Sequence, residues 1–207
     1  MEATWLAWIK RIHALAGSGL HYGKEEFDRE RYAEIAELAE KMLADLAQAP
    51  LAEIRAQFPT LGQSYATPLV DVRGAVFRDD KILLVQEKTD ACWALPGGYA
   101  DLGLSGAQNA VKEIREETHL TVTAHSLISV RHKAKHDYVH DARDFYKLFF
   151  YCELETEDAP SAGHEVHDAR FFGRDELPEL SRQRVILEDL QMAWAHAENP
   201  SRMPHFD

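Results

Sequence analysis

Residues 97–120, GGYADLGLSGAQNAVKEIREETHL, decide the fold. The two adjacent glycines can adopt backbone angles that are closed to other residues, so the stretch begins with a tight turn. Ser105 is a favourable N-cap, and the apolar residues that follow it recur every three or four positions. The pattern predicts a helix over residues 106–118, whose buried stripe contains Ala107, Ala110, Val111 and Ile114.

Three glutamates share the other side of this helix and are expected to face solvent. Glu113, Glu116 and Glu117 are three and four residues apart, so their carboxylates converge. Glu113 and Glu117 repel each other across one turn, by roughly 0.2–0.5 kcal/mol, and the C-terminal end of a helix favours cations. A bound divalent ion would remove both penalties, and oxygen ligands suit Mg²⁺ or Mn²⁺. The alternative is an ordinary solvated face, with Lys112 and Arg115 as neighbours.

The glycine pair before the helix favours the metal site, because the whole stretch resembles the Nudix box, G-x5-E-x7-R-E-U-x-E-E-x-G-U, in which U is aliphatic. The spacing is intact, and the matching residues are Gly98, Glu113, Ile114, Glu116, Glu117 and Leu120. Three positions depart from the pattern: Leu104 replaces the first glutamate, Lys112 the arginine and His119 the last glycine. The longer stretch, with its flanks, resembles the branch around CDP-choline pyrophosphatase, which carries leucine and lysine at two of these positions.

The resemblance implies an α/β (α+β) fold, the Nudix α/β/α sandwich with a mixed sheet, preceded by a small N-terminal helical domain. It implies that Glu113 and Glu117 are the chief metal ligands, that Glu116 helps, and that the carbonyl of Gly97 adds another ligand. It also implies a further acid near residues 163–173, for which Glu165 is the best match and Asp168 the second. The implied cofactor is Mg²⁺ or Mn²⁺.

The implied reaction is hydrolysis of the diphosphate of a nucleoside diphosphate linked to another group, of the CDP-choline or ADP-ribose type. The products would be a nucleoside monophosphate and a phosphorylated second product. Glu117 would act at the reacting centre as a ligand, and either Glu116 or Glu165 would be the base. Three alternatives remain: a pyrophosphatase that removes nucleoside triphosphates, a non-catalytic nucleotide sensor, and an isomerase that uses a reactive cysteine, for which Cys92 is a poor candidate.

Four residues outside the box are candidates for substrate binding. Arg73 could hold a phosphate, or it could pair with a carboxylate such as Asp71 or Glu87. Tyr99 lies in the loop over the metal face, and Lys133 and His136 lie in a polar loop at 131–143 that could meet the substrate. The spacing of His132, His136 and His140 would suit zinc only on a helix, which this loop does not support.

The N-terminal third is expected to be helical, over residues 3–16, 24–48 and 51–57. Two stripes are predicted to face inward: Trp5, Trp8, Ile9, Ile12 and Ala16, and then Tyr32, Ile35, Ala39, Met42, Leu43 and Leu46. These helices are too few to bury both stripes alone. We therefore expect two domains, residues 1–62 for homodimer formation and residues 63–207 for catalysis. Binding of another protein by the helices is the alternative.

The rest of the second domain is predicted to contain a hairpin over residues 70–85, strands at 120–130, 144–154 and 169–172, and a helix at 182–197 with a loose tail after it. Trp93 is expected in the core.

The composition limits the kinds of partner that this protein is expected to bind. The net charge of −12 argues against non-specific binding of nucleic acid, which requires a basic surface. The two cysteines show no metal spacing and predict free thiols. No apolar run approaches the roughly 18 residues of a membrane span, so the expected protein is soluble, cytoplasmic and free of membrane contacts.

Overall fold

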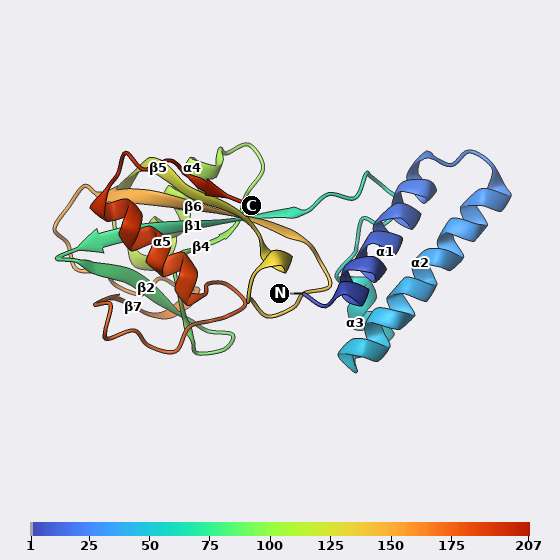
Figure 1. Ribbon diagram of the computed structural model, residues 1–207, viewed down its shortest axis with the longest axis horizontal. Helices are drawn as coiled ribbons and strands as arrows, with labels where there is room; N and C mark the ends of the chain where they lie inside the picture. Colours follow the sequence, from blue (N-terminus) through green and yellow to red (C-terminus); the bar gives the residue numbers. More distant parts are fainter. Residues whose placement is uncertain (1) are drawn as a thin grey trace. The chain divides into compact units, whose positions relative to one another are not determined.

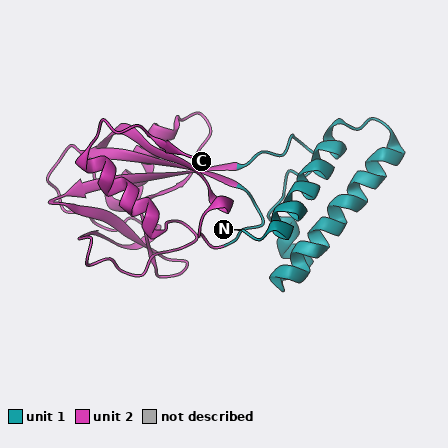
Figure 2. Ribbon diagram, viewed as in Figure 1, with its two compact units in different colours: residues 1–68, 140–144 teal, residues 69–139, 145–207 magenta. Residues whose placement is uncertain are grey.

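The computed structural model describes residues 2–207, which form two compact units (Figure 2). The first unit runs to Pro68 and also contains His140–Asp144, and the second contains Leu69–Val139 and Phe145–Asp207. The boundary expected at 62 lies in the linker at the end of the first unit, six residues before Pro68. No helix in the described part of the chain is long and apolar enough to cross a membrane.

The helical unit consists of α1 (Thr4–Tyr22), α2 (Glu26–Ala47) and α3 (Leu51–Ala56), with α1 and α2 running antiparallel (Figure 1). α1 continues through Gly17 and Gly19 to Tyr22, beyond its predicted end at residue 16. Close packing explains the glycines, because a Cβ atom at Gly19 would lie 2.5 Å from the ring of Tyr32 and one at Gly17 would lie 2.8 Å from Leu61. Glycine here permits contact between segments and does not end the helix.

The predicted inward faces of α1 and α2 are partly correct, because Ile9 and Ala16 on α1 and Ala39 and Leu43 on α2 are buried as expected. Trp5, Trp8 and Ile12 are exposed, as are Ile35, Met42 and Leu46 on α2. The buried positions lie beside them, and the core of the unit is Leu6, Ile9, Ala39, Leu43 and Ile54. Small alanines let the helices approach closely, and the buried side chains of Lys10 and Glu40 form ion pairs. Those pairs join Lys10 to Glu2 and Asp144, and Glu40 to Arg55.

The second unit is built on one mixed sheet, in the order β3-β2-β1-β6-β5-β8, with β4 also paired to β1 and β7 to β2. β1 pairs in parallel with β6, and β5 in parallel with β8, while the other pairs are antiparallel. The strands are β1 (Leu69–Arg78), β2 (Lys81–Glu87), β3 (Trp93–Ala94), β4 (Gly97–Tyr99), β5 (Val122–His132), β6 (Phe145–Leu154), β7 (Val166–Phe172) and β8 (His205–Phe206). The predicted hairpin is β1–β2, whose turn residues Asp79 and Asp80 both have positive φ.

Helices cover both faces of this sheet (Figure 1). α4 (Gly106–Thr118) packs on one face through Ile114, which lies against Gly74 of β1. α5 (Leu187–Glu198) packs on the other through Trp194, whose ring centroid is 6.1 Å from that of Phe77. Trp93 is buried as expected, edge-on to Phe172. The α/β/α sandwich with a mixed sheet is therefore confirmed.

Two predictions for the C-terminal region were wrong in detail. α5 begins at Leu187 and not at 182, because the backbone N–H of Ile186 donates to the Asp189 carboxylate at 2.8 Å and so starts the helix there. The tail is not loose, since His205–Phe206 forms β8 on the edge of β5. A short 3-10 helix, η1 (Lys133–Lys135), follows β5 in the predicted polar loop.

Candidate active site

The helix that carries the glutamates is defined at both ends by local hydrogen bonds. Ser105 Oγ accepts from the Gln108 N–H at 3.2 Å, and Gln108 Oε1 accepts from the Ser105 N–H at 2.8 Å, which is a complete capping box. His119 ends the helix in the left-handed conformation with φ 57°. The predicted bounds of 106–118 and the predicted cap are confirmed.

The loop before α4 is fixed by one buried amide. Asn109 Oδ1 accepts the Asp101 N–H at 2.9 Å, and its Nδ2 donates to the Ser105 carbonyl at 3.1 Å. Asn109 is fully buried. The loop from β4 to α4 is therefore held to the helix independently of any charged side chain.

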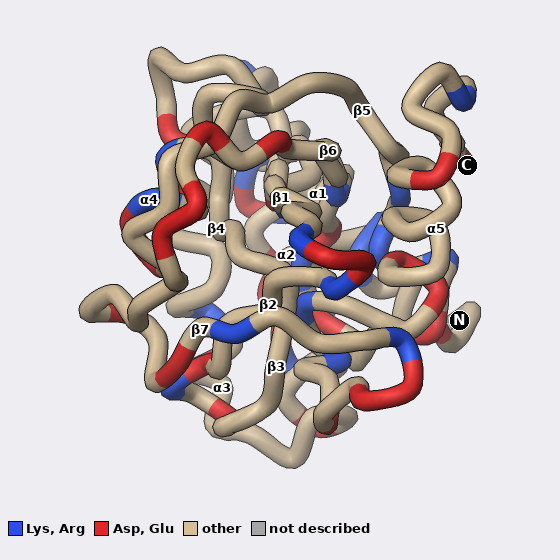
Figure 3. Tube along the Cα trace, turned by 90° about the vertical axis from the view of Figure 1, so that its left-hand side faces the viewer, with Lys and Arg blue, Asp and Glu red and all other residues tan. Residues whose placement is uncertain are grey.

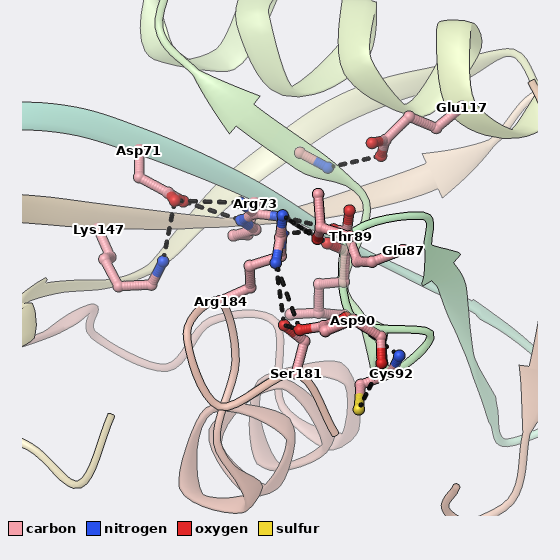
Figure 4. Close-up of polar contacts among 12 residues, drawn as sticks. Asp71, Arg73, Glu87, Thr89, Asp90, Cys92, Glu117, Lys147, Ser181 and Arg184 are labelled. Atoms are coloured by element: carbon pink, nitrogen blue, oxygen red, sulfur yellow. Dashed lines mark hydrogen bonds and ion pairs between the residues drawn. The ribbon is translucent and has the colours of Figure 1, made fainter. Parts of the chain in front are cut away.

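Two of the three glutamates point inward, which corrects the expectation that all three face solvent. Glu113 and Glu117 are buried, whereas Glu116 is exposed. Glu117 Oε2 accepts the backbone N–H of Gly97 at 2.9 Å (Figure 4). A Cβ atom at Gly98 would lie 3.2 Å from Glu113 Oε2. The glycine pair thus brings the main chain of β4 against both carboxylates.

Burial without enough positive charge makes these carboxylates unusually basic. Burial raises the pKa of Glu117 to about 8, helped by the charges of Glu87 and Glu113 and opposed by Arg73 and the Gly97 N–H. Burial also raises the pKa of Glu113, and Glu116 and Glu165 add to that rise while Lys112 opposes it. An added cation would reverse both shifts.

Basic residues are interspersed with the acids along α4 (Figure 3). The Lys112 Nζ lies 2.7 Å from Glu116 Oε2, 3.3 Å from Asp101 Oδ2 and 3.6 Å from Glu113 Oε1. The hydrogen bond to Glu116 is the largest cause of the raised pKa of Lys112. Its ammonium group is therefore a firmly charged monovalent cation on the carboxylate face.

The loop that carries Glu165 is attached to the end of α4 by main-chain contacts. The Gly163 N–H donates to the Glu117 carbonyl at 2.9 Å, and a Cβ atom at Gly163 would lie 1.8 Å from the Glu116 carbonyl oxygen. Glu165 is exposed, pairs with His164 at 3.2 Å, and raises the pKa of Glu113. The structure thus brings Glu165 to the glutamate face, while Asp168 lies on β7 and pairs with Arg170.

The donor set suits a hard divalent cation. Within residues 2–207 no three His, Cys, Asp or Glu side chains are already gathered as a metal centre. The carboxylates on this face nevertheless offer only oxygen donors, two of them are buried with raised pKa values, and a lysine ammonium already contacts three acids. These features fit Mg²⁺ or Mn²⁺ and do not fit softer metals.

Arg73 is the centre of a buried ion-pair network and is only 4% exposed (Figure 4). It donates to the Asp71 carboxylate at 2.8 and 3.0 Å and to the Leu95 carbonyl at 3.1 Å, and it lies 3.9 Å from Glu87. Of its two suggested roles, the ion pair is the one that the structure shows. Through Leu95 it also holds the short segment between β3 and β4 that leads to Gly97.

Sequence reasoning named Asp71 and Glu87 as partners of Arg73 but missed the basic residues that pair with these two carboxylates. Lys147 Nζ is 3.0 Å from Asp71 Oδ2, and Arg184 Nε is 2.8 Å from Glu87 Oε1. Lys147 faces Asp71 because β6 lies in parallel beside β1, a long-range pairing that the sequence does not reveal. The available signal was the charged residues within otherwise apolar strands, since such residues rarely occur in a core without partners.

The remaining candidates for substrate binding lie in two places. Tyr99 is 54% exposed and its ring stacks on Phe145, with centroids 5.9 Å apart, while the Lys133 Nζ lies 4.9 Å from the centroid of the same Phe145 ring. His136 contacts Asp207 through Nε2 at 2.7 Å and Arg131 through Nδ1 at 2.5 Å. Tyr99 and Lys133 therefore contact the same ring, that of Phe145, whereas His136 is held by Arg131 and the C-terminal Asp207.

Two family models match the sequence. Residues 3–58 match the model described as a UDP-X-like, N-terminal oligomerisation domain, and residues 68–190 match the NUDIX domain. The chain belongs to the Nudix family. The expected class, a Nudix hydrolase with an N-terminal extension, is thereby confirmed.

Known proteins are similar to this member of the Nudix family over most or all of its length. The protein YjhB of Bacillus subtilis, provisionally named an ADP-ribose pyrophosphatase, is 38% identical over 207 residues, covering 100% of this chain and 99% of the relative. A crystal structure of a UDP-X diphosphatase has a TM-score of 0.62 at 32% identity, and 100% of each chain is covered. An ADP-ribose pyrophosphatase from Streptococcus suis has a TM-score of 0.61 at 35% identity, covering 68% of this chain and 100% of the other.

Proposed function

We propose that this protein is a Mg²⁺- or Mn²⁺-dependent pyrophosphohydrolase of nucleoside diphosphates linked to a second group. The observation that carries the proposal is the pair of buried carboxylates, Glu113 and Glu117, held against the Gly97–Gly98 main chain with raised pKa values. Such a pair is costly in a folded protein unless a cation neutralises it. The relatives named ADP-ribose pyrophosphatase and UDP-X diphosphatase support this class of substrate.

Glu113 and Glu117 would hold the ion, with Glu116 and the carbonyl of Gly97 as further ligands. When bound, the ion neutralises the diphosphate and lowers the pKa of the attacking water. Glu117 is positioned for this role by the Gly97 N–H, which occupies one of its oxygens and leaves the other available. The glycine pair keeps side chains out of the space between the main chain and Glu113.

A carboxylate near the ion would take a proton from the attacking water. The water oxygen then bonds to phosphorus while the bridging P–O bond breaks. Glu116 and Glu165 are both candidates for this base. Glu116 contacts Lys112 at 2.7 Å, and Glu165 is on a loop joined to α4 through Gly163. Their separate glutamine variants distinguish them.

Tyr99 and Lys133 are the side chains that we assign to the substrate. The exposed Tyr99 ring follows Gly98 directly in β4 and is held by Phe145, so it can support a base or sugar beside the carboxylates. The ammonium group of Lys133 lies over the Phe145 ring and adds positive charge for an anionic leaving group. Arg73 would act from beneath by holding the Leu95–Gly97 segment, and His136 would orient the loop after β5 through its contacts with Asp207 and Arg131.

The test is a panel of nucleotides, each with Mg²⁺ or Mn²⁺, in which the products are separated and identified. ADP-ribose, CDP-choline and UDP-linked sugars should yield a nucleoside monophosphate and a phosphorylated second product. Faster turnover of nucleoside triphosphates would replace this substrate class, and hydrolysis of no compound would favour a nucleotide sensor.

Variants assign the roles in the same assay. Glu117→Gln should lower kcat/KM by at least about tenfold, since even outer partners of metal sites cost that much. Whichever of Glu116→Gln and Glu165→Gln removes the base should lower kcat by about 10²–10⁴. Glu157→Gln, an exposed acid on the segment before Glu165, is the matched control and should leave kcat unchanged. Turnover of Glu117→Gln within threefold of the wild type at saturating Mg²⁺ would contradict the assignment.

We also propose that the helical unit forms a homodimer through an exposed apolar helix face. This face consists of Trp5, Trp8, Ile12 and Leu15 on α1 and Ile35, Leu38, Met42 and Leu46 on α2. On each helix these residues are displaced by about one residue, or 100°, from the buried stripe in the same sense. Since the helices are antiparallel, the two displaced stripes lie on one side of the pair. The matching oligomerisation model supports a second copy as the occupant.

A further inference from the structure

The Lys112 side chain contacts the carboxylates that a divalent ion would need as ligands. Its ammonium contacts Glu116, Asp101 and Glu113 at 2.7, 3.3 and 3.6 Å. Glu113 and Glu116 are ligands in the proposed site, so the lysine and the ion would share two carboxylates. We propose that Lys112 is a tethered competing cation, which occupies Glu113 and Glu116 in the metal-free protein and moves onto Asp101 alone when the ion binds. This inference rests on the metal site of the proposed function.

The third partner makes such a displacement possible. Asp101 lies in the loop between β4 and α4, whereas Glu113 and Glu116 lie on the helix itself. Asn109 fixes this loop by hydrogen bonds to the Asp101 N–H and to the Ser105 carbonyl, so the loop keeps its place when the lysine gives up the glutamates. Lys112 then remains paired with one carboxylate, and no charge is left without a partner.

The charge of Lys112 opposes metal binding in two ways. Glu113 and Glu116 must exchange the ammonium for the ion, and the ammonium stays a few ångströms from it afterwards. Two positive charges on the ion and one on the lysine repel each other even when water screens them strongly. Removing the lysine charge should therefore tighten divalent-ion binding by about tenfold, on the basis of that repulsion.

The experiment is a titration of the purified full chain with Mn²⁺, in which the free ion is measured by electron paramagnetic resonance. It compares the wild type with Lys112→Met, which keeps an unbranched side chain as far as Cε and removes the ammonium group. Arg115→Met is the matched control, since Arg115 is exposed, lies on the same helix and carries the same charge. Circular dichroism verifies that each variant is folded, and Lys112→Gln provides a second variant without the charge.

We expect Lys112→Met and Lys112→Gln to bind Mn²⁺ about tenfold more tightly than the wild type, and Arg115→Met to stay within twofold of it. Equal tightening by Arg115→Met would show a general effect of net charge and overturn the inference. Unchanged or weaker binding by the Lys112 variants would overturn it as well and would make the lysine an organiser of the carboxylates. If the wild type itself bound no Mn²⁺, the metal site of the proposed function would fail with it.

Discussion

At the scale of single residues, the protonation of Glu117 makes the stability of the metal-free protein depend on pH. Its carboxyl group has a folded-state pKa of about 8, against an ordinary value of 4.5, because it is buried. The folded protein therefore binds a proton on Glu117 over a pH range in which the unfolded chain has already released it. Stability must fall as pH rises through this range.

We predict that the metal-free wild type loses stability between about pH 5 and pH 8, whereas Glu117→Gln is spared most of this loss. The difference should be on the order of 3 kcal/mol, because each pKa unit of difference corresponds to about 1.4 kcal/mol. Urea unfolding in EDTA at several pH values measures it. Equal slopes for the two proteins would show that Glu117 is not held in the protonated form, and added Mn²⁺ should remove the loss in the wild type.

The same residue shows what the sequence could and could not reveal. The spacing of Glu113, Glu116 and Glu117 placed them on one side of a helix, as found. The sequence could not show that Glu113 and Glu117 are buried, because their cover comes from the glycine pair of β4 and from the distant loop at Gly163. Arg73 was given two roles for the same reason, since its partner depends on how close Asp71 and Glu87 come in space.

At the scale of secondary structure, the way β4 packs against β1 depends on Gly97. This residue has φ 147° and pairs with Arg73 of β1, and a Cβ atom at this position would lie only 2.0 Å from the Val72 carbonyl oxygen. An alanine would have to push β4 away from β1 and so away from the Glu117 carboxylate. Gly103 also has a positive φ, of 85°, but a Cβ atom there would meet nothing within 4 Å.

We predict that Gly97→Ala lowers the free energy of unfolding by about 3 kcal/mol or more, through strain and collision together. Gly103→Ala, which adds only the backbone strain, should cost about 1 kcal/mol. Chemical denaturation of both variants beside the wild type measures the two values. Similar costs at the two positions would mean that the close approach of β4 to β1 contributes little.

Local signals explain which elements were predicted well. α4 was placed to the residue because its cap, its stripe and its terminating residue all lie within fifteen neighbouring positions. The inward face of α2 was only partly correct. Ala39 and Leu43 are buried as expected, but Ile35, Met42 and Leu46 are apolar yet exposed, and the buried contact also uses Ala36 and Glu40. β8 was missed because two residues gain strand structure only by pairing with β5.

At the scale of the whole molecule, the exposed apolar helix face predicts the assembly. Its eight side chains, on α1 and α2, are larger and more apolar than the residues of a solvated helix face. A second copy of the same face would bury them, and a self-complementary contact of this kind gives a closed dimer.

We predict that the wild type is a dimer, and that Trp8→Glu or Leu38→Glu converts it to a monomer at micromolar concentration, because each places a charge in the apolar contact. Light scattering coupled to size-exclusion chromatography measures the mass. Ala33→Glu is the control, since Ala33 is exposed on α2 away from the apolar helix face and gains the same charge. A wild-type monomer would contradict the proposal, and so would dimers of both Trp8→Glu and Leu38→Glu.

The tryptophans are divided between the two units, with Trp5 and Trp8 exposed in the helical unit and Trp93 and Trp194 buried in the sheet unit. Indole emission shifts to longer wavelength in water, so each unit has its own intrinsic fluorescence signal. A soluble quencher such as iodide would reach the first pair and spare the second. Protection of Trp5 and Trp8 from the quencher would then report association of the helical units. A red shift in the emission of Trp93 and Trp194 would report unfolding of the sheet unit.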